Sequence, residues 1–170
     1  MTCSATEQLY IPSLFSLQAD ELFTRVSNCE CQSERLDCLF CKIQKPNFEK
    51  EIVYENEFFY ATRDSYPVTK FHTLIIPKRH IQSYFEMNTN EIQSINQILN
   101  FQRNEIIELD TSVTAFNIGI NDGKDAGQSI YHLHVHLIPR RLGDIKNPRG
   151  GVRGVIPDKQ KYEKNKSLEK

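Results

Sequence analysis

The sequence predicts an α+β fold in which an antiparallel sheet packs against one long helix. Two observations indicate this fold. Short apolar runs typical of strands lie on both sides of a single long amphipathic segment, and strands and helices do not alternate regularly along the chain. Regular alternation would favour a parallel sheet instead. At 170 residues the chain has room for one domain with a single core.

The chain is expected to divide into three parts. Residues 1–35 are polar and weakly patterned and form an N-terminal extension, with a short helix predicted at residues 18–26. Residues 36–142 hold the regular apolar patterns and form the main domain. Residues 143–170 are a tail rich in Arg, Gly and Pro, and its last eight residues, mostly Lys, Glu and Asn, are expected to be disordered.

The first half of the domain predicts three strands. Residues 52–55 and 58–61 are apolar runs on either side of Asn56 and Glu57, which is typical of a hairpin. A turn-rich stretch, residues 63–70, leads into a third strand at residues 73–77.

The long helix is predicted from Asn88 to about Leu109. Asn88 is a favourable cap, and Glu91 stands three residues further on, as in a capping box. Apolar residues then recur at helical spacing, at Ile92, Ile95, Leu99 and Ile106. A strand at residues 113–120, a loop at residues 121–127 and a final strand from residue 132 follow the helix. Residues 140–162 are expected to be irregular.

The final strand carries an unusual row of histidines. Residues 132–136 read His-Leu-His-Val-His. Alternate side chains of a strand share one face, so the row consists of His132, His134 and His136, with Leu133, Val135 and Leu137 facing the core. Each imidazole has two ring nitrogens that need partners, so packing alone does not explain the row.

The chain has only five histidines, and the other two, His72 and His80, flank the strand at residues 73–77. These two histidines are eight residues apart, so both face the same side if the strand is regular. We therefore interpret the two strands as the walls of one active site.

Composition and charge exclude several classes of function. The net charge of −1 creates no basic field for a nucleic acid polymer or an anionic membrane. No apolar run approaches the roughly 20 residues of a membrane span, and the first residues do not resemble a secretory signal. Five cysteines is an odd number, and with no export signal it favours a reducing, cytoplasmic setting in which thiols do not form disulfides.

Two blocks of sequence resemble the histidine triad (HIT) superfamily. The first runs from Asp64 to His80 and ends Leu-Ile-Ile-Pro-Lys-Arg-His, and the second runs from Gly127 to Arg140 and contains the histidine row. The resemblance covers residues 36–142 and implies a HIT-like antiparallel sheet of about five strands, with one long helix and a short one. The tail is more similar to bacterial HIT hydrolases linked to dinucleoside polyphosphates than to nucleoside phosphoramidases.

The resemblance implies a nucleotide hydrolase with His134 as the nucleophile. A neutral imidazole near pH 7 can attack phosphorus if an acceptor holds its other ring nitrogen as N–H. Attack on an α-phosphate gives a nucleotidyl-His134 intermediate, which water then hydrolyses. His136 is expected to donate a hydrogen bond to the phosphate or the leaving group. Expected substrates are dinucleoside polyphosphates such as diadenosine tetraphosphate, nucleoside phosphoramidates or adenylylated small molecules.

The same resemblance assigns the substrate contacts. Asp64 is expected to accept hydrogen bonds from the ribose hydroxyls, and His72 to support the catalytic histidines. The phosphate site is expected to include Asn121, Gln128 and Ser129, and the base is expected to enter an apolar slot formed by Leu39, Phe40 and Ile43. Phe71 stands where the family usually has glycine, so the turn before His72 is expected to differ.

Cys38 and Cys41 have the spacing of two metal ligands on one turn. The resemblance supplies two more ligands, His80 and His132, which complete a closed Cys2His2 site. Such a set binds zinc in a structural role and leaves His134 free. The alternative is that the two cysteines are simply small buried thiols. Cys29 and Cys31 offer a rival pair, with a spacing less suited to zinc.

Other interpretations stay open at the level of sequence. The whole histidine row could bind one catalytic metal, or the intermediate could pass to phosphate or a sugar phosphate, as in a transferase or phosphorylase. A zinc-containing nucleotide- or partner-binding module without turnover is a third possibility. A homodimer is expected from the resemblance. The tail arginines either lie in a solvated loop or contact distal phosphates, and they are Arg140, Arg141, Arg149 and Arg153.

Overall fold

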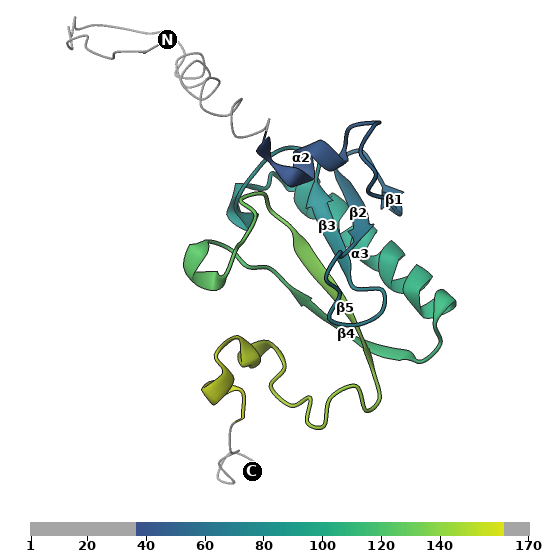
Figure 1. Ribbon diagram of the computed structural model, residues 1–170, viewed down its shortest axis with the longest axis vertical. Helices are drawn as coiled ribbons and strands as arrows, with labels where there is room; N and C mark the ends of the chain where they lie inside the picture. Colours follow the sequence, from purple (N-terminus) through teal and green to yellow (C-terminus); the bar gives the residue numbers. More distant parts are fainter. Residues whose placement is uncertain (1–36, 162–170) are drawn as a thin grey trace, which may run out of the picture. The chain divides into compact units, whose positions relative to one another are not determined.

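A five-stranded antiparallel sheet organises the computed structural model, which describes residues 37–161 (Figure 1). Its strands lie in the order β1-β2-β3-β5-β4, and every neighbouring pair is antiparallel. The strands are β1 (Tyr54–Glu55), β2 (Phe59–Arg63), β3 (Thr73–Pro77), β4 (Val113–Gly119) and β5 (Val135–Arg141). The short helix is α2 (Leu39–Ile43) and the long one is α3 (Thr89–Leu109). The predicted α+β class is therefore confirmed.

Helix α3 begins where its capping residues predict. The side chain of Asn88 accepts a hydrogen bond from the backbone N–H of Glu91 at 3.0 Å, and the Glu91 carboxylate accepts from the backbone N–H of Asn88 at 2.9 Å. The helix then buries Ile95, Ile98 and Ile106 against the sheet. Ile92, which was expected on this face, is 41% exposed, so that one assignment is wrong.

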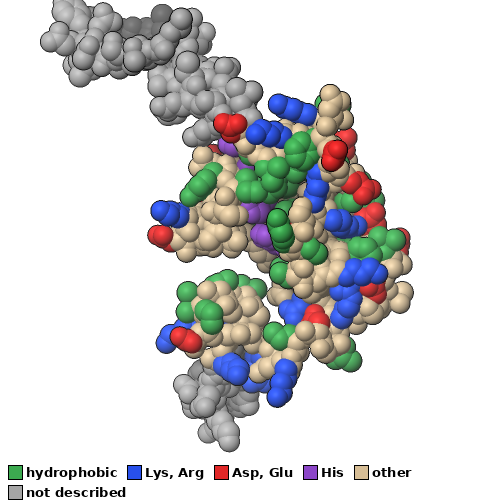
Figure 2. All heavy atoms as spheres, viewed as in Figure 1, with side chains coloured by type: hydrophobic (Ala, Val, Ile, Leu, Met, Phe, Trp, Pro, Cys, Tyr) green, Lys and Arg blue, Asp and Glu red, His purple; other side chains and the backbone are tan. Residues whose placement is uncertain are grey.

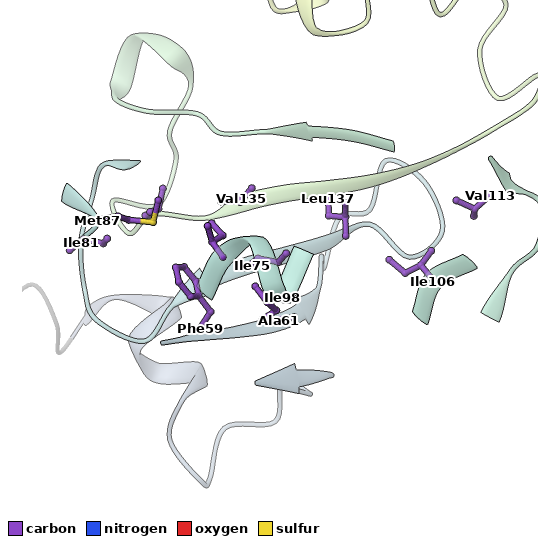
Figure 3. Close-up of a cluster of buried hydrophobic side chains, with 12 residues drawn as sticks. Phe59, Ala61, Ile75, Ile81, Met87, Ile98, Ile106, Val113, Val135 and Leu137 are labelled. Atoms are coloured by element: carbon purple, nitrogen blue, oxygen red, sulfur yellow. The ribbon is translucent and has the colours of Figure 1, made fainter. Parts of the chain in front are cut away.

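The two faces of β2 and β3 are covered by different elements. One face packs in the main core with α3, and Figure 3 shows Phe59, Ala61 and Ile75 among its side chains. The other face packs against α2 in a second buried cluster, formed by Phe40, Ile43, Tyr60, Leu74 and Ile76. The side chains of β5 alternate in the same way. Leu133, Val135 and Leu137 are each 1% exposed and join the main core, so the histidines point to the opposite side.

The strand that carries the histidines begins at Val135 and not at His132. Its pairing with β3 starts at the Ile75–Val135 pair. If the same register continued two residues further, Leu133 would lie opposite Pro77. Proline has no N–H to donate to the hydrogen-bond ladder. The N–H of Leu133 instead donates to the carbonyl of Ile81 at 2.6 Å. His132 and His134 therefore lie in the segment that leads into β5, although the alternation of buried side chains continues through it.

Three other boundaries differ from the prediction. In the hairpin, β1 contains only two residues, whereas β2 extends to Arg63 along the full length of β3. Arg140 and Arg141 belong to β5 and not to an irregular tail. Short 3-10 helices also occur at η1 (Tyr84–Glu86), η2 (Lys124–Ala126), η3 (Val152–Val155) and η4 (Pro157–Lys159).

Some predictions fall on residues that the structure does not describe. They are the N-terminal extension with its helix at residues 18–26, the rival cysteine pair and the disordered last eight residues. Within residues 37–161, no helix combines the length and the apolar character needed to cross a bilayer.

Candidate active site

All five histidines gather on the α2 side of the sheet, in two groups that meet at His134. Figure 2 shows histidine side chains at the surface of this face, next to hydrophobic side chains. One group joins His80 and His132 to two cysteines, and the other joins His72 and His136 to Asp64. His72 and His80 thus belong to different groups, because they lie just beyond opposite ends of β3.

The imidazole of His134 is oriented by its own backbone. Its Nδ1 lies 2.8 Å from the carbonyl oxygen of His132, and because a carbonyl only accepts, Nδ1 carries the proton. The other ring nitrogen, Nε2, is then left with its lone pair. The edge of the Phe40 ring packs against His134, with ring centroids 5.2 Å apart, and His134 is 6% exposed. The arrangement presents one nucleophilic nitrogen and excludes most water from the rest of the ring.

The first group has the geometry of a tetrahedral metal site. The Sγ of Cys38 lies 3.4 Å from His132 Nδ1, and the Sγ of Cys41 lies 3.3 Å from His80 Nδ1 and 3.6 Å from His132 Nδ1. Zinc bonds of about 2.3 Å to sulfur and 2.0 Å to nitrogen place such ligand pairs about 3.5 Å apart. All four ligand atoms lie within 4.8 Å of one another. The residues therefore fit a Cys2His2 zinc site.

The ring of His132 has the tautomer that a metal ligand at Nδ1 requires. Its Nε2 donates to the carbonyl of Pro77 at 2.8 Å, which leaves Nδ1 deprotonated and aimed at the thiols. Burial is the main cause that lowers the pKa of His132 to about 4, and the Pro77 carbonyl partly opposes it. His132 therefore stays neutral near pH 7. Because its Nδ1 faces Cys38, and His134 Nδ1 is bonded to a carbonyl, the three histidines of the row do not converge on one metal.

In the second group, three side chains contact one another in series. His136 Nδ1 lies 3.0 Å from His72 Nε2, and His72 Nδ1 lies 3.3 Å from an Asp64 carboxylate oxygen. Burial lowers the pKa of both imidazoles, to about 4 for His136, and Asp64 opposes this in both. The backbone N–H of His72 donates to Thr69, whose hydroxyl donates to the carbonyl of Pro139. The loop before β3 therefore fixes this chain against β5.

The residues predicted to contact phosphate lie in a loop that is held by hydrogen bonds to other parts of the protein. The Gln128 amide accepts from the N–H of Gly123 and donates to the carbonyl of Gln82, both at 2.8 Å. Ser129 is exposed and Asn121 is half-buried. Gln128 thus holds the loop to the residues that follow His80. These hydrogen bonds are separate from the predicted contact of Gln128 with phosphate, which stays a prediction.

The predicted base slot is only partly open. Leu39 is 44% exposed, but Phe40 and Ile43 are 3% and 5% exposed and pack into the second core cluster. Of the three residues, Phe40 reaches His134. The structure therefore exposes Leu39 and buries both Phe40 and Ile43, with the Phe40 ring against His134.

Two of the tail arginines already have carboxylate partners. Arg140 forms two hydrogen bonds to Asp144, at 2.7 and 2.8 Å, and Arg141 bonds Asp110 at 2.8 Å. These contacts favour a structural role for both. Arg153 donates to the carbonyl of Lys159 at 3.1 Å.

Sequence reasoning missed the backbone acceptors of the site. The carbonyls of His132 and Pro77 determine which ring nitrogen of His134 and of His132 carries the proton, and the Gln82 carbonyl anchors the loop at Gln128. The contact between Asp64 and His72 was also missed. Every residue has a backbone carbonyl, so residue identity in the sequence does not indicate which carbonyls accept these hydrogen bonds.

The chain is similar to a known protein family and to proteins of solved structure. Residues 45–143 match the HIT domain family. A zinc-bound histidine triad family protein from Mycobacterium smegmatis has a similar structure, with a TM-score of 0.61 and 32% identity over 66% of this chain and 81% of that one. The adenylylsulfatase HINT3 of Arabidopsis thaliana is 32% identical over 71% of this chain and 66% of its own length. A Plasmodium falciparum diadenosine triphosphate hydrolase gives a TM-score of 0.54 at 28% identity, over 65% of this chain and 72% of that one.

Proposed function

The chain belongs to the HIT domain family, and from this membership and the His134 geometry we propose that it is a nucleotide hydrolase. The observation that carries the proposal is the hydrogen bond from His134 Nδ1 to the His132 carbonyl, because it leaves the Nε2 lone pair for attack. The low exposure of His134 supports the same role, since a mostly buried nucleophile is less hydrated.

The reaction proceeds in two displacements at one phosphorus. His134 Nε2 attacks the α-phosphate, a P–N bond forms, and the P–O bond to the leaving group breaks. Water then attacks the same phosphorus, the P–N bond breaks, and the electron pair returns to Nε2. The products are a mononucleotide and the released partner, and His134 is restored.

The proposed substrates are dinucleoside polyphosphates such as diadenosine tetraphosphate. Two relatives bear the names adenylylsulfatase and diadenosine triphosphate hydrolase, and both names describe enzymes that act on adenylyl compounds. Ribose contact by Asp64, phosphate contact by Asn121, Gln128 and Ser129, and base contact by Leu39, Phe40 and Ile43 are part of the proposal. Asp64 is already near His72, but its carboxylate has further lone pairs for a ribose hydroxyl.

We also propose that the Cys38, Cys41, His80 and His132 cluster holds a structural zinc ion. The ligand spacing and the zinc-bound relative support it. When bound, zinc cross-links the start of the domain to the segments around β3 and β5. The nucleophile lies outside the ligand set, so the proposed chemistry does not pass through the metal.

The proposed setting is a cytoplasmic homodimer. Cysteines placed as zinc ligands, at Cys38 and Cys41, are consistent with a reducing compartment. Strand β4 is at the edge of the sheet, and beside it a groove of about 260 Å³ is lined by residues of α3 and β4 such as Leu99 and Ile118. An open strand edge next to an apolar groove is a surface that a second copy could cover.

The test is turnover of diadenosine tetraphosphate by the wild type and by His134→Asn. We expect the variant to lose at least about 10⁴-fold in kcat, because the nucleophile is removed. Zinc content and circular dichroism establish that the variant is folded. Mass spectrometry of the quenched wild type is expected to show one added nucleotidyl group, absent from the variant. Equal rates for the two proteins would contradict the proposal, and nucleoside diphosphate release that requires added phosphate would identify a phosphorylase.

A further inference from the structure

One face of β4 and β5 continues from the histidines to the tail. Alternate side chains of a strand share a face, so the face that carries His136 also carries Ile138 and Arg140. Their partners on β4 are Gly119, Asn117 and Ala115. Four residues of extended chain separate His136 from Arg140, a distance of about 13 Å. The face therefore leads from the candidate active site to the far end of the sheet.

This face is open beside His136. Gly119, which pairs with His136, is exposed, and a Cβ added to it would meet no atom within 4 Å in the described part of the chain. Asn117 and Ile138 come next and are half-buried. A ligand chain that leaves His136 along the strands therefore first passes a position without a side chain.

At its far end the face meets a cavity of about 500 Å³ between β4 and the start of the tail. The sheet contributes Asn117 and Arg140 to its walls, and the tail contributes Leu142, Ile145 and Lys146. Leu142 is 97% exposed and Ile145 is 46% exposed, so both offer apolar surface to a ligand. Sites for small organic ligands typically have this size and combine apolar walls with a few polar groups.

Two glycines hold the tail in the conformation that forms this cavity. Gly150 has φ of +72°, and a Cβ there would come within 2.1 Å of the Gln160 carbonyl oxygen. Gly151 lines the cavity beside Asn117, where an added Cβ would stand 3.4 Å from the amide nitrogen. The tail therefore turns on itself at Gly150 and packs on the sheet at Gly151.

The cavity lies in the most basic part of the chain. Residues 140–161 contain seven Lys or Arg and two Asp, a net charge of +5, although the whole chain carries −1. Arg140 is paired with Asp144, whereas the structure gives Lys146 and Arg149 no carboxylate partner among the described residues. A ligand with several negative charges is therefore attracted to this end of the sheet.

We propose that this cavity binds the second nucleoside of a dinucleoside polyphosphate, with the polyphosphate lying along β5 between the cavity and His134. The inference rests on the proposed function and adds to it a subsite for the part of the substrate that leaves. Phe40, a proposed contact of the first base, packs against the rings of His132 and His134. The second nucleoside therefore extends the other way along the row, past His136.

The length of this face favours one class among the proposed substrates. A chain of four phosphates with its ribose spans a distance of the order of the 13 Å between His136 and Arg140, estimated from about 3.4 Å per residue. The single phosphorus of a nucleoside phosphoramidate does not. Diadenosine tetraphosphate is therefore preferred to phosphoramidates and to adenylylated small molecules, which cannot occupy both ends.

Equilibrium binding to His134→Asn, in which turnover is blocked, tests the subsite with two matched ligands. Adenosine 5′-tetraphosphate differs from diadenosine tetraphosphate by the missing second adenosine, and it carries more negative charge. Charge alone therefore predicts that it binds at least as tightly. We expect calorimetry to show diadenosine tetraphosphate binding about tenfold more tightly, because the second adenosine binds as a tethered group. Equal affinities, or tighter binding of adenosine tetraphosphate, would refute the proposal.

A pair of exposed apolar residues of the tail locates the effect. Leu142→Ser removes part of the cavity wall and is expected to reduce the affinity ratio of the two ligands to about threefold. Val152→Ser is the matched control, because Val152 is also exposed but does not line the cavity, and it is expected to leave the ratio unchanged. An unchanged ratio in Leu142→Ser, or the same fall in both variants, would contradict the assignment.

Two lysines separate a local charge from the general field of the tail. Lys146→Glu and Lys159→Glu make the same change of charge, but only Lys146 lines the cavity. We expect Lys146→Glu to weaken diadenosine tetraphosphate binding about tenfold and Lys159→Glu to weaken it less than about twofold. Equal losses would show that the tail acts only as a diffuse positive field.

Backbone nitrogen-15 spectra show where the second adenosine lies. Diadenosine tetraphosphate is expected to shift the amide signals of residues 142–146 more than adenosine tetraphosphate does. If Leu142→Ser instead dissociates a dimer in the absence of ligand, the cavity belongs to an interface between copies and the proposal is overturned. Turnover by the wild type reports on the proposed function separately, because the affinity ratio decides the subsite whether or not hydrolysis is observed.

Discussion

His132 and His134 are joined by a hydrogen bond of 2.8 Å, from the ring Nδ1 of His134 to the carbonyl oxygen of His132. The ring of His132 instead approaches the cysteines, with its own Nδ1 3.4 Å from the Sγ of Cys38. One residue therefore offers its ring to the proposed zinc site and its carbonyl to the proposed nucleophile. The position of the His132 backbone links the two sites.

Loss of the metal is expected to remove stability and activity together. Cys41→Ser replaces a thiolate that lies near both His80 and His132, so zinc binding should fall below one equivalent. At a zinc concentration about 1,000 times its Kd, the lost binding corresponds to about 4 kcal/mol in the free energy of unfolding. Metal analysis, chemical denaturation and diadenosine tetraphosphate turnover measure the three effects.

Chelation of the wild type gives an independent comparison. A catalytic metal would leave a folded, inactive protein after chelation, whereas a structural zinc predicts that unfolding and inactivation follow the same time course. Retention of full activity at zero zinc content would show that the cluster does not support His134.

Stability is expected to fall between pH 6.5 and about 4. Burial lowers the pKa of His136 to about 4, so in this range the unfolded chain binds more protons than the folded one. The contribution is present above the unfolded pKa of about 6.5 and is lost as pH falls through this range, and it amounts to at most about 3 kcal/mol.

Urea denaturation of the wild type and His136→Gln across this range isolates that contribution. The variant keeps the burial of His72 but has no titratable group at position 136, so its stability should depend less steeply on pH. Identical pH profiles for the two proteins would show that His136 is not held neutral by the fold.

The backbone conformation of Phe71 predicts that glycine at this position gives a more stable protein than alanine. It has φ of +69°, a left-handed conformation that a side chain normally avoids, and it stands just before His72. Phe71→Ala and Phe71→Gly both lose the ring, which contacts the core and lies under the cations of Arg63 and Lys70. Only glycine also relieves the strain. We expect Phe71→Gly to be more stable than Phe71→Ala by about 1 kcal/mol, measured by chemical denaturation.

Glu91 is expected to contribute more to stability than its capping partner. Asn88→Ala removes one cap hydrogen bond and should lower the free energy of unfolding by about 1 kcal/mol. Glu91 is 2% exposed and bonds both Asn88 and Arg79, at 2.7 to 2.9 Å. Glu91→Ala leaves Arg79 without this partner, and we expect a loss of about 2 to 3 kcal/mol. Equal losses of unfolding free energy in Asn88→Ala and Glu91→Ala would mean that the contact between Glu91 and Arg79 does not stabilise the protein.

The parts of the site that were predicted from sequence depend on side-chain chemistry at short range. The CxxC spacing, the histidine row and the Asn88 capping box each lie within a few residues, so local geometry decides them. The grouping of Cys38 and Cys41 with His80 and His132 came from resemblance, and the structure brings those four together.

The parts that were not predicted depend on pairing across the fold. The start of β5 is determined by Pro77 on the neighbouring strand, and that register is not visible in the residues around His132. The contact of Asp64 with His72 likewise depends on a turn that passes through the left-handed Phe71. Spacing along the chain could not reveal either.

The Gln128 amide uses both of its ends inside the protein, at Gly123 and at Gln82. These two hydrogen bonds hold the loop in the protein alone. If the loop binds phosphate as proposed, association restricts few rotatable bonds of the protein, and the entropy lost on binding comes mainly from the ligand. Differences in affinity between nucleotides with short and long polyphosphate chains are therefore expected to follow the flexibility of the chains themselves.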